Sequence, residues 1–387
     1  MQKKIAILGS TGSVGNTTLN IIRKDKKNFK VVLLTAKNNY KKLLKQAREF
    51  NVKNIVVYNL KYYKYLKYKL RNKKINIYSS QDKLSKILKK KIDYTICGIS
   101  GLDGLGPCLE SIKFSKTIGI ANKESIICGW NLIKKNLKKY NTEFIPVDSE
   151  HYSIWNLTKE YSNEDIEEII LTASGGPFLK SPIYLQRKIT PEKAIKHPNW
   201  KMGKKISVDS ANLMNKVFEV IEARRIFDFD LKKYRILIHP QSYAHAIIKF
   251  SNGLIKILLH DTDMKIPIFN SIYSKDLKYI PSKKIKAKTL NNLNFYEVDS
   301  IRFPSIKILK KISKMNTLFD TIITIANEEL VNLFLERKIS FRQIEKNLIK
   351  IISLKEYKKY FYKKPNSLNE IYHVSEMVRL KTRSLSV

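Results

Sequence analysis

Two carboxylates stand close together in the segment Pro146-Val-Asp148-Ser-Glu150-His151. If this backbone is extended, alternate side chains point to the same side, so Asp148 and Glu150 face one ligand together. Such a pair repels unless a cation or a proton lies between the two groups, and oxygen ligands suit Mg²⁺ or Mn²⁺. The segment therefore predicts a divalent metal site, although the same pair at a strand end is also common on protein surfaces.

A second polar set follows in the segment from Asp209 to Glu222, for which we expect one helix over about Ser210–Ala223. Its buried stripe would consist of Leu213, Val217, Val220 and Ile221. The opposite side would carry Asn212, Asn215, Lys216 and Glu219, and it is either a solvent face or the wall of a site. In a site, Glu219 supplies a third metal carboxylate. A phosphate or hydroxyl groups would bind Ser210, Asn215 and Lys216 near the helix N-terminus.

A glycine-rich turn, Gly9-Ser-Thr-Gly12-Ser-Val-Gly15, lies between the first expected strand and helix. Glycine there permits a tight turn and a close approach to a pyrophosphate, while the helix N-terminus offers N–H donors. A turn without a ligand is the alternative. After the second strand, where an NAD site has Asp or Glu, the chain has Lys37-Asn38-Asn39. A lysine and two amides suit a 2′-phosphate and favour NADPH.

Two loops complete the candidate chemistry. Ser174-Gly-Gly-Pro-Phe178 follows a strand, and its N–H groups and hydroxyl form either an anion cradle or an ordinary turn. His197-Pro-Asn-Trp200-Lys-Met202-Gly203 places an imidazole beside two large apolar side chains. These side chains either pack permanently or belong to a lid that closes over a ligand.

The elements that must position these residues alternate in the first third of the chain. Strands are expected at 4–8, 29–35, 54–58, 94–97 and 117–120, and helices at 17–23 and 40–50, which predicts a doubly wound parallel sheet. A later region has a strand at 168–172 and a hairpin of 246–250 and 254–259 around Asn252-Gly253. The C-terminal part is helical, with one helix at 318–336 and capping boxes at Ser340 and Ser367.

Basic residues far outnumber acidic ones, with 74 Lys and Arg against 34 Asp and Glu and a net charge of +40. Such a charge attracts nucleic acid, anionic lipid or phosphorylated small molecules. Because the lysines are spread along the whole chain, we interpret them as a general compositional bias. The densest stretch, Tyr58–Lys74, is either a single-strand nucleic-acid face or a solvated helix with Leu and Tyr turned inward, which we favour.

Composition also indicates the class of protein and its cellular compartment. Hydrophobic residues make up 43% of the chain, and no apolar run approaches the roughly 20 residues that span a bilayer. Cys97, Cys108 and Cys128 form neither a CxxC motif nor a disulfide framework. We therefore expect a soluble, cytoplasmic protein in a reducing compartment, with neither a membrane nor a specific nucleic acid as partner.

Together, these segments resemble the 1-deoxy-D-xylulose 5-phosphate reductoisomerase family. The resemblance covers nearly the whole chain. It rests on seven ordered blocks, namely GSTGSVG at 9–15, ANKES at 121–125, PVDSEH at 146–151, SGGPF at 174–178, HPNWKMGKKISVDSANLMNK at 197–216, EVIEA at 219–223 and HPQS at 239–242.

The resemblance implies a role for each matching residue. NADPH would contact Thr11, Gly12, Ser13, Val14, Lys37, Asn38, Asn39, Asn122, Glu124 and Gly203. The divalent ion would bind Asp148, Glu150 and Glu219. Substrate would contact Lys123, Ser149, Glu150, Ser174, His197, Ser210, Asn215, Lys216 and Glu219. Catalysis would depend on Lys123, Trp200 of the lid and the three metal carboxylates.

The resemblance also implies a reaction. With Mg²⁺ or Mn²⁺, the family breaks and remakes a carbon–carbon bond of a ketose phosphate, and NADPH then reduces the branched aldehyde to 2-C-methyl-D-erythritol 4-phosphate, a step of the non-mevalonate isoprenoid pathway. Homodimers are implied as well. Alternatives are a plain NADP-dependent dehydrogenase and a basic nucleic-acid-binding protein. The chain departs from the family pattern at Lys37-Asn38-Asn39, where Gly-Lys-Asn is common, and at 259–264, where glycine and proline are usual.

We therefore predict an α/β protein with three folded parts. They are an N-terminal Rossmann-like, doubly wound parallel sheet, a central α+β catalytic domain and a C-terminal helical bundle. The expected boundaries are 1–147 for the NADPH-binding domain, 148–273 for the catalytic and dimerisation domain, 274–299 for a linker and 300–387 for the helical domain.

Overall fold

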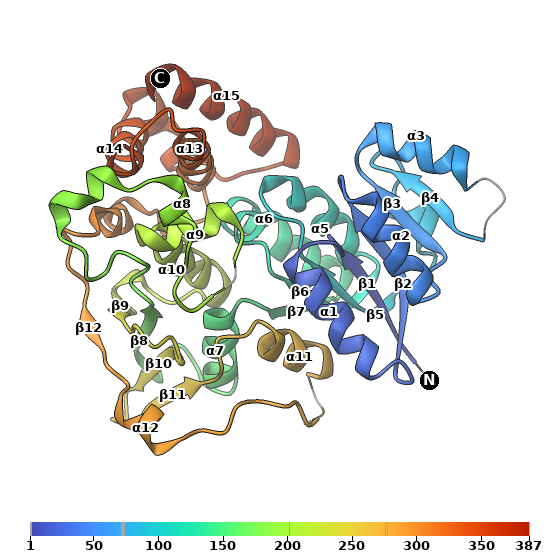
Figure 1. Cartoon of the computed structure of the whole chain (residues 1–387), viewed down its shortest axis with the longest axis horizontal. Coiled ribbons are helices and arrows are strands. Elements are labelled where there is room, and N and C mark those ends of the chain that lie inside the picture. Colours follow the sequence, from blue (N-terminus) through green and yellow to red (C-terminus); the bar gives the residue numbers. More distant parts are fainter. Residues whose placement is uncertain (1, 71–73, 201, 275, 277, 387) are drawn as a thin grey trace. The chain divides into compact units, whose positions relative to one another are not determined.

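The computed structural model describes residues 2–70, 74–200, 202–274, 276 and 278–386 (Figure 1). Parts of the expected basic stretch (71–73), of the lid (201) and of the linker (275 and 277) lie outside the described residues. The chain forms two compact units. Unit 1 comprises Met1–Ser125, Leu132–Asp148 and Met264–Ile280, and unit 2 comprises Ile126–Asn131, Ser149–Asp263 and Pro281–Val387. The predicted division at 147, 273 and 299 follows the chain in order and stays a prediction.

Unit 1 is built on a seven-stranded parallel sheet in the order β4-β3-β2-β1-β5-β6-β7. Its strands are β1 (Lys3–Leu8), β2 (Phe29–Ala36), β3 (Asn54–Val57), β4 (Asn76–Ser79), β5 (Ile92–Cys97), β6 (Ser115–Ile120) and β7 (Glu143–Pro146). The strand order reverses at β1, whose neighbours are β2 and β5. Open α/β sheets bind ligands beyond the carboxyl ends of the strands at such a point. The predicted doubly wound sheet is confirmed.

The helices of unit 1 connect and cover these strands. They are α1 (Ser13–Lys24), α2 (Tyr40–Glu49), α3 (Leu60–Lys69), α4 (Leu84–Ile87), η1 (Leu102–Gly104), α5 (Leu105–Ile112), α11 (Lys265–Tyr273) and most of α6 (Lys123–Tyr140). Leu66 of α3 is buried and Tyr62 and Tyr63 pack against the core, whereas Tyr68 is 74% exposed, so only some of the tyrosines of this basic helix turn inward as expected. Helix α11 returns from late in the sequence, and its Ile268 and Ile272 join the core.

The glycine-rich turn occupies the expected place between β1 and α1. Gly9 has φ +81°, and a Cβ there would lie 2.8 Å from the carbonyl oxygen of Gly98. A Cβ on Gly15 would lie 2.4 Å from the Cα of Ser10. Any larger residue at either position would therefore push the turn away from the strand, which explains both glycines. The turn lies at the end of β1, where the strand order reverses.

Unit 2 contains a five-stranded mixed sheet in the order β11-β10-β8-β9-β12. The strands are β8 (Ile166–Ala173), β9 (Tyr234–Ile238), β10 (Ala244–Phe250), β11 (Ile255–Leu259) and β12 (Tyr296–Glu297). Strands β8 and β9 are parallel, and the other pairs are antiparallel. The predicted hairpin is confirmed as β10 and β11, with Gly253 at φ +86° in its turn.

The helices of unit 2 precede the sheet, cover it or follow it. They are α7 (Ser149–Thr158), η2 (Ile183–Lys188), α8 (Pro191–Ala194), α9 (Lys204–Ala211), α10 (Met214–Phe227), η3 (Leu231–Lys233), α12 (Ala287–Asn291), η4 (Pro304–Lys311), α13 (Leu318–Leu335), α14 (Phe341–Ile352), η5 (Lys355–Phe361) and α15 (Leu368–Ser386). Helices α13, α14 and α15 form the predicted C-terminal helical part (Figure 1). Among the described residues, no helix is long and apolar enough to cross a membrane.

The prediction of a single helix over Ser210–Ala223 is wrong, because the helix is interrupted between α9 and α10. Leu213 has φ +62°, and the Asn212 side chain accepts a hydrogen bond from the N–H of Met214 (3.0 Å). Ser305 of η4 donates its hydroxyl to the Asn212 carbonyl (2.6 Å), which holds the break in place. The residues of the expected apolar stripe are buried, but helix α10 is buried on nearly all its other sides as well, so its polar side is not a solvent face.

The capping boxes differ in outcome. At Ser340, the Ser side chain accepts from the backbone of Gln343 and the Gln343 side chain accepts from the Ser340 N–H, as predicted. At Ser367, only half of the box forms. The Ser367 hydroxyl accepts from the Glu370 N–H (3.2 Å), but the Glu370 carboxylate accepts instead from the N–H of Asn366 (2.9 Å).

Glu345 of α14 is a buried acid, with 5% of its surface exposed. Burial raises its pKa to about 7, and this effect exceeds the opposing attraction of Arg342. In the unfolded chain the pKa returns to near 4.5. As the pH rises, the unfolded state loses this proton first. The free energy of unfolding therefore falls between about pH 4.5 and about pH 7 and stays lower above it.

Replacing this acid with an amide, Glu345→Gln, is expected to remove the pH-dependent loss. The variant should be more stable than the wild type by about 3–4 kcal/mol near pH 8 and should show little gain near pH 4, since one pKa unit corresponds to about 1.4 kcal/mol. Urea unfolding at several pH values measures this difference. A gain that is the same at all pH values would contradict the assignment.

Candidate functional site

The first two carboxylates lie at the start of α7. Strand β7 ends at Pro146 and α7 begins at Ser149, so the extended backbone expected for this segment is wrong. Glu150 instead occupies the first helical turn, where the helix dipole favours negative charge. Ser149 donates its hydroxyl to the Glu150 carboxylate. The pair of acids is thus presented by the beginning of a helix.

Helix α10 brings a third carboxylate and a lysine to the same place. Lys216 is 3% exposed and donates from Nζ to Glu150 Oε1 (2.7 Å), and it also forms an ion pair with Glu219. Asn215 Nδ2 donates to Glu219 Oε1 (2.6 Å). Burial acts to lower the pKa of Lys216, but the two carboxylates outweigh it and raise the pKa overall. The lysine is therefore a fixed positive charge between Glu150 and Glu219.

Asp148 completes the group of acids. It is bonded directly to Ser149, and one oxygen each from Asp148, Glu150 and Glu219 lie within 4.8 Å of one another. Lys123 forms an ion pair with Asp148. Gathering three carboxylates is unfavourable without positive charge nearby. Lysine ammonium groups already contact these acids, which shows that the group attracts positive charge. An all-oxygen donor set of this kind fits a divalent ion such as Mg²⁺ or Mn²⁺.

A separate polar cradle follows β8. Nδ1 of His197 accepts hydrogen bonds from the N–H groups of Asn199 (3.1 Å) and Trp200 (3.0 Å). This nitrogen therefore carries no proton, so Nε2–H donates to the Ser174 hydroxyl (2.9 Å). Ser174 Oγ also accepts from the Gly176 N–H (3.1 Å). Burial lowers the pKa of His197 to about 4, so the ring is a neutral donor near pH 7.

The loop that carries Trp200 is anchored by its neighbours. Asn199 Nδ2 donates to the Pro240 carbonyl (2.6 Å) and to Ser242 Oγ (2.8 Å). The Trp200 indole meets the His245 ring edge-to-face at 6.0 Å. His245 is in turn stacked on His260, with ring centroids 3.7 Å apart.

Several residues expected at the cofactor lie at strand ends of unit 1. Asn122 begins α6 by accepting from the Ser125 N–H (2.6 Å), and it donates to the Gly101 carbonyl (2.7 Å), which ties two loops together. After β2, Lys37 pairs with Asp103 (2.7 Å). Asn38 accepts from Asn59 (2.9 Å), and Asn39 caps α2 through the Lys42 N–H (3.2 Å).

Comparison with known proteins decides the family. The family model described as 1-deoxy-D-xylulose 5-phosphate reductoisomerase matches residues 5–129, and models of the C-terminal domains of the same enzyme match residues 144–227 and 259–381. A Pelagibacter ubique protein named 1-deoxy-D-xylulose 5-phosphate reductoisomerase is 55% identical over all 387 residues, which is 100% of both chains. The chain belongs to the 1-deoxy-D-xylulose 5-phosphate reductoisomerase family.

Other members of this reductoisomerase family agree with the assignment. A Wolbachia pipientis relative is 38% identical over 88% of both chains. The Zymomonas mobilis reductoisomerase, solved in complex with NADPH, has a TM-score of 0.90 and 31% identity over 100% of this chain and 99% of its own. A reductoisomerase solved with NADPH, fosmidomycin and magnesium has a TM-score of 0.90 and 30% identity over 99% and 98%.

The reductoisomerase residues expected from sequence divide between the two units. Unit 1 holds Thr11, Gly12, Ser13 and Val14 in the β1–α1 turn, Lys37, Asn38 and Asn39 after β2, and Asn122, Lys123 and Glu124 at the start of α6. Unit 2 holds Ser149, Glu150, Ser174, His197, Trp200, Gly203, Ser210, Asn215, Lys216 and Glu219. Gly203 precedes α9, so its contact with NADPH stays a prediction, as do the individual roles of the others.

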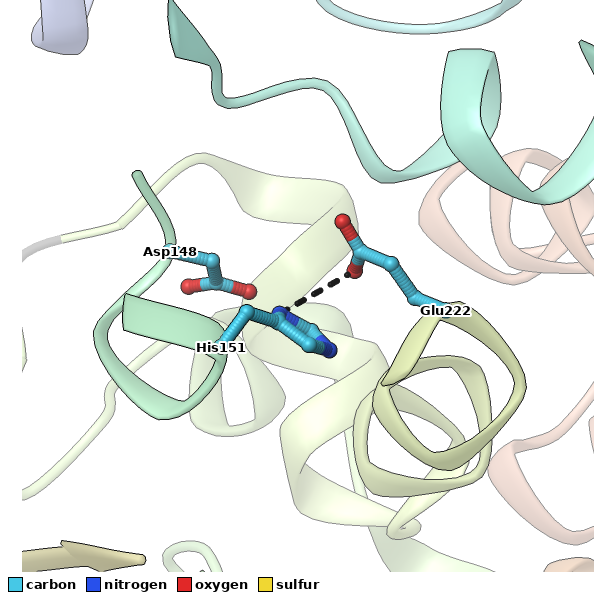
Figure 2. Close-up of side chains that lie close together, drawn as sticks. All are labelled: Asp148, His151 and Glu222. Carbon is cyan, nitrogen blue, oxygen red and sulfur yellow. Dashed lines mark ion pairs between the residues drawn. The ribbon is translucent and has the colours of Figure 1, made fainter. Parts of the chain in front are cut away.

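Sequence reasoning missed two buried residues beside the acids, His151 and Glu222. His151 is 0% exposed and Glu222 is 1% exposed. Figure 2 shows the two side chains together with Asp148. With Asp148 they form a second group of potential metal ligands. The described residues contain two such groups, and Asp148 belongs to both. His151 belongs to the quoted family block, but its partner is 71 positions away, and no spacing pattern in the sequence connects them.

Proposed function

We propose that this chain converts 1-deoxy-D-xylulose 5-phosphate into 2-C-methyl-D-erythritol 4-phosphate, using NADPH and a divalent metal ion, in isoprenoid biosynthesis. Membership of the reductoisomerase family along the full length supports the reaction, and the reductoisomerases solved with NADPH and magnesium support the cofactors. On this chain, the observation that carries the proposal is the convergence of Asp148, Glu150 and Glu219. A plain dehydrogenase has no need of three carboxylates gathered in this way.

The three acids and the lysines that contact them would form the metal-binding part of the site. Asp148, Glu150 and Glu219 would hold the divalent ion, which supplies charge stabilisation for the carbonyl and the neighbouring hydroxyl of the ketose. Lys216 lies against two of these acids and offsets part of their repulsion. Asn215 holds the Glu219 carboxylate in one orientation through a 2.6 Å hydrogen bond. The site is therefore preorganised for charge that develops on the substrate oxygens.

The cradle after β8 accounts for the phosphate end. His197 presents Nε2–H, and Ser174 accepts from it and from Gly176, which leaves the Ser174 hydroxyl proton able to donate. The Ser174 hydroxyl, which is held in place by the N–H of the neutral imidazole, would donate to a phosphate without burying another full charge. Binding energy from this remote group orients the reacting carbons. Trp200, on a loop fixed by Asn199, would exclude water from the fragments while the carbon skeleton rearranges.

The direct test follows NADPH absorbance with the purified full-length protein, 1-deoxy-D-xylulose 5-phosphate and Mg²⁺. We expect oxidation of NADPH that stops when EDTA is added and returns with excess Mg²⁺. Folded, metal-treated protein that leaves NADPH unoxidised would contradict the proposal. Oxidation that continues unchanged in EDTA would argue against the metal-dependent reaction.

The cellular compartment and the oligomeric state are also proposals. The reaction belongs in the cytoplasm, where thiols stay reduced, and Cys97, Cys108 and Cys128 are all buried and not joined in a disulfide. We further propose that the chain works as a homodimer, as the family resemblance implies. Strand β11 is at the edge of the unit 2 sheet, and Leu254, Ile255 and Ile257 beside or on it are 57%, 61% and 45% exposed. An apolar edge strand of this kind is a natural surface for a second copy.

Charges placed on this edge are expected to separate the dimer. The double variant Ile255→Glu and Ile257→Lys should run at about the 45.2 kDa of one chain, while the wild type runs at about twice that mass. Light scattering after size exclusion measures both. Leu380→Lys, at a side chain 72% exposed on α15, is the matched control and should stay dimeric. A double variant that remains dimeric would place the interface elsewhere.

A further inference from the structure

The buried pair missed by sequence reasoning bridges the two helices that carry metal carboxylates. His151 lies on α7, one residue after Glu150, and Glu222 lies on α10, one turn after Glu219. Nε2 of His151 lies 2.9 Å from the backbone carbonyl oxygen of Glu219. Nδ1 lies 3.5 Å from Glu222 Oε2, the ion pair drawn as a dashed line in Figure 2. Both nitrogens of one ring therefore face acceptors on α10.

This geometry fixes the ring in one orientation. An imidazole is planar and rigid, and its two nitrogens point in different directions. One nitrogen contacts the backbone of Glu219, and the other contacts the side chain one turn further along the same helix. Because the ring is attached to α7, its position couples α7 to α10 beside Glu150 and Glu219. A shift of either helix would change the separation of the two carboxylates.

Burial argues that the pair has a specific task. His151 and Glu222 are 0% and 1% exposed, and removing a carboxylate from water is costly unless it is well paired. A hydrophobic contact would join the helices at a lower desolvation cost, but it would not fix the rotation of the ring or the position of a carbonyl. A polar bridge gives that directionality.

We propose that Glu222 is a positioning residue that holds His151 against the Glu219 backbone and thereby sets the separation of Glu150 and Glu219 for metal binding. The inference rests on the proposed function, because those two acids are its proposed metal ligands. Residues that orient the ligands of a metal typically change its affinity by about 10–100-fold when they are removed. Glu222 therefore acts on metal affinity rather than on the reacting atoms.

The test measures Mn²⁺ binding to the full-length protein by electron paramagnetic resonance, without substrate or turnover. We expect Glu222→Gln, which keeps the size of the side chain, to raise the Mn²⁺ dissociation constant by about tenfold or more. At saturating Mn²⁺, kcat should return to within a few-fold of the wild-type value. His151→Gln, which keeps a donor toward the Glu219 carbonyl but loses the Glu222 contact, should weaken Mn²⁺ binding as well.

Glu329→Gln is the matched control. Glu329 is a glutamate 3% exposed on α13, paired with Arg379 and Arg383, so its loss reports what removing a buried acid does to stability alone. If Glu222→Gln binds Mn²⁺ as tightly as the wild type and Glu329→Gln do, Glu222 is only structural and the inference is wrong. If the wild type itself fails to bind Mn²⁺, the proposed metal site fails and the inference fails with it.

Discussion

Replacing Glu219 with glutamine is expected to lower NADPH oxidation by about a thousandfold or more while the protein stays folded. Glutamine has the same shape but no charge, so a carboxylate that would hold the metal is lost. Asn215 and Lys216, which contact Glu219, lose an anionic acceptor at the same time. Steady-state rates across a range of Mg²⁺ concentrations measure the effect, and circular dichroism checks the fold.

Glu345→Gln provides the control for this experiment. It also converts a buried glutamate to glutamine, but on α14, and should leave the rate at saturating substrate unchanged. Near-normal turnover of Glu219→Gln under limiting metal would contradict the role of Glu219. A loss of activity caused by unfolding would appear in the dichroism of the variant and would not be counted as support.

Replacing Lys216 with methionine is expected to destabilise the metal-free protein by about 3–5 kcal/mol, because breaking a buried ion pair leaves charges without compensation. Glu150 and Glu219 would then face each other without the ammonium group that now contacts both. A divalent ion held by the proposed ligands would supply positive charge at the same place. Excess Mg²⁺ should therefore raise the free energy of unfolding of Lys216→Met more than that of the wild type.

Lys205→Met separates this effect from the loss of an ordinary ion pair. Lys205 pairs with the buried Asp209 (2.9 Å) on α9, so its loss also leaves a buried charge without compensation and is expected to cost about 3–5 kcal/mol, but with no added response to Mg²⁺. Urea unfolding of the wild type and of both variants, each with and without Mg²⁺, measures these responses. Equal stabilisation of Lys216→Met and the wild type by Mg²⁺ would mean that the lysine and the metal do not share these acids.

The alternation of strands and helices in the first third was predictable because each strand there is a short apolar run that ends at a turn signal. The glycine-rich turn was predictable for the same reason, since close approach at Gly9 and Gly15 leaves room for no side chain. The hairpin followed from Asn252-Gly253, a strong turn signal. These features are encoded locally, within a few residues of one another.

The break between α9 and α10 could not be predicted from local sequence. No glycine or proline marks it, and Leu213 adopts a left-handed conformation that a leucine rarely takes. The hydroxyl that donates to the Asn212 carbonyl belongs to Ser305, which lies 93 positions further along the chain. The break separates Ser210 on α9 from Asn215, Lys216 and Glu219 on α10, so the polar residues expected on one helix face come from two helices.

The acids at α7 lie together as predicted, although the backbone conformation expected for them was wrong. Asp148 and Glu150 lie close together with Glu219, but the backbone is helical from Ser149 and not extended. Residue types supplied the chemistry, because gathered carboxylates need a cation in any backbone conformation. The bridge from His151 to Glu222 had no such signal, since it depends on how α7 packs against α10.

The methyl signal of the product, in proton magnetic resonance, tests the central claim most directly. In the substrate the methyl group is bonded to the carbonyl carbon. Rearrangement followed by reduction leaves the methyl group on a carbon without hydrogen, so the account predicts a methyl singlet that forms only when Mg²⁺ and NADPH are both present. Direct reduction of the ketone would place a hydrogen on that carbon and give a methyl doublet. A doublet would contradict the account and would identify a plain NADP-dependent dehydrogenase.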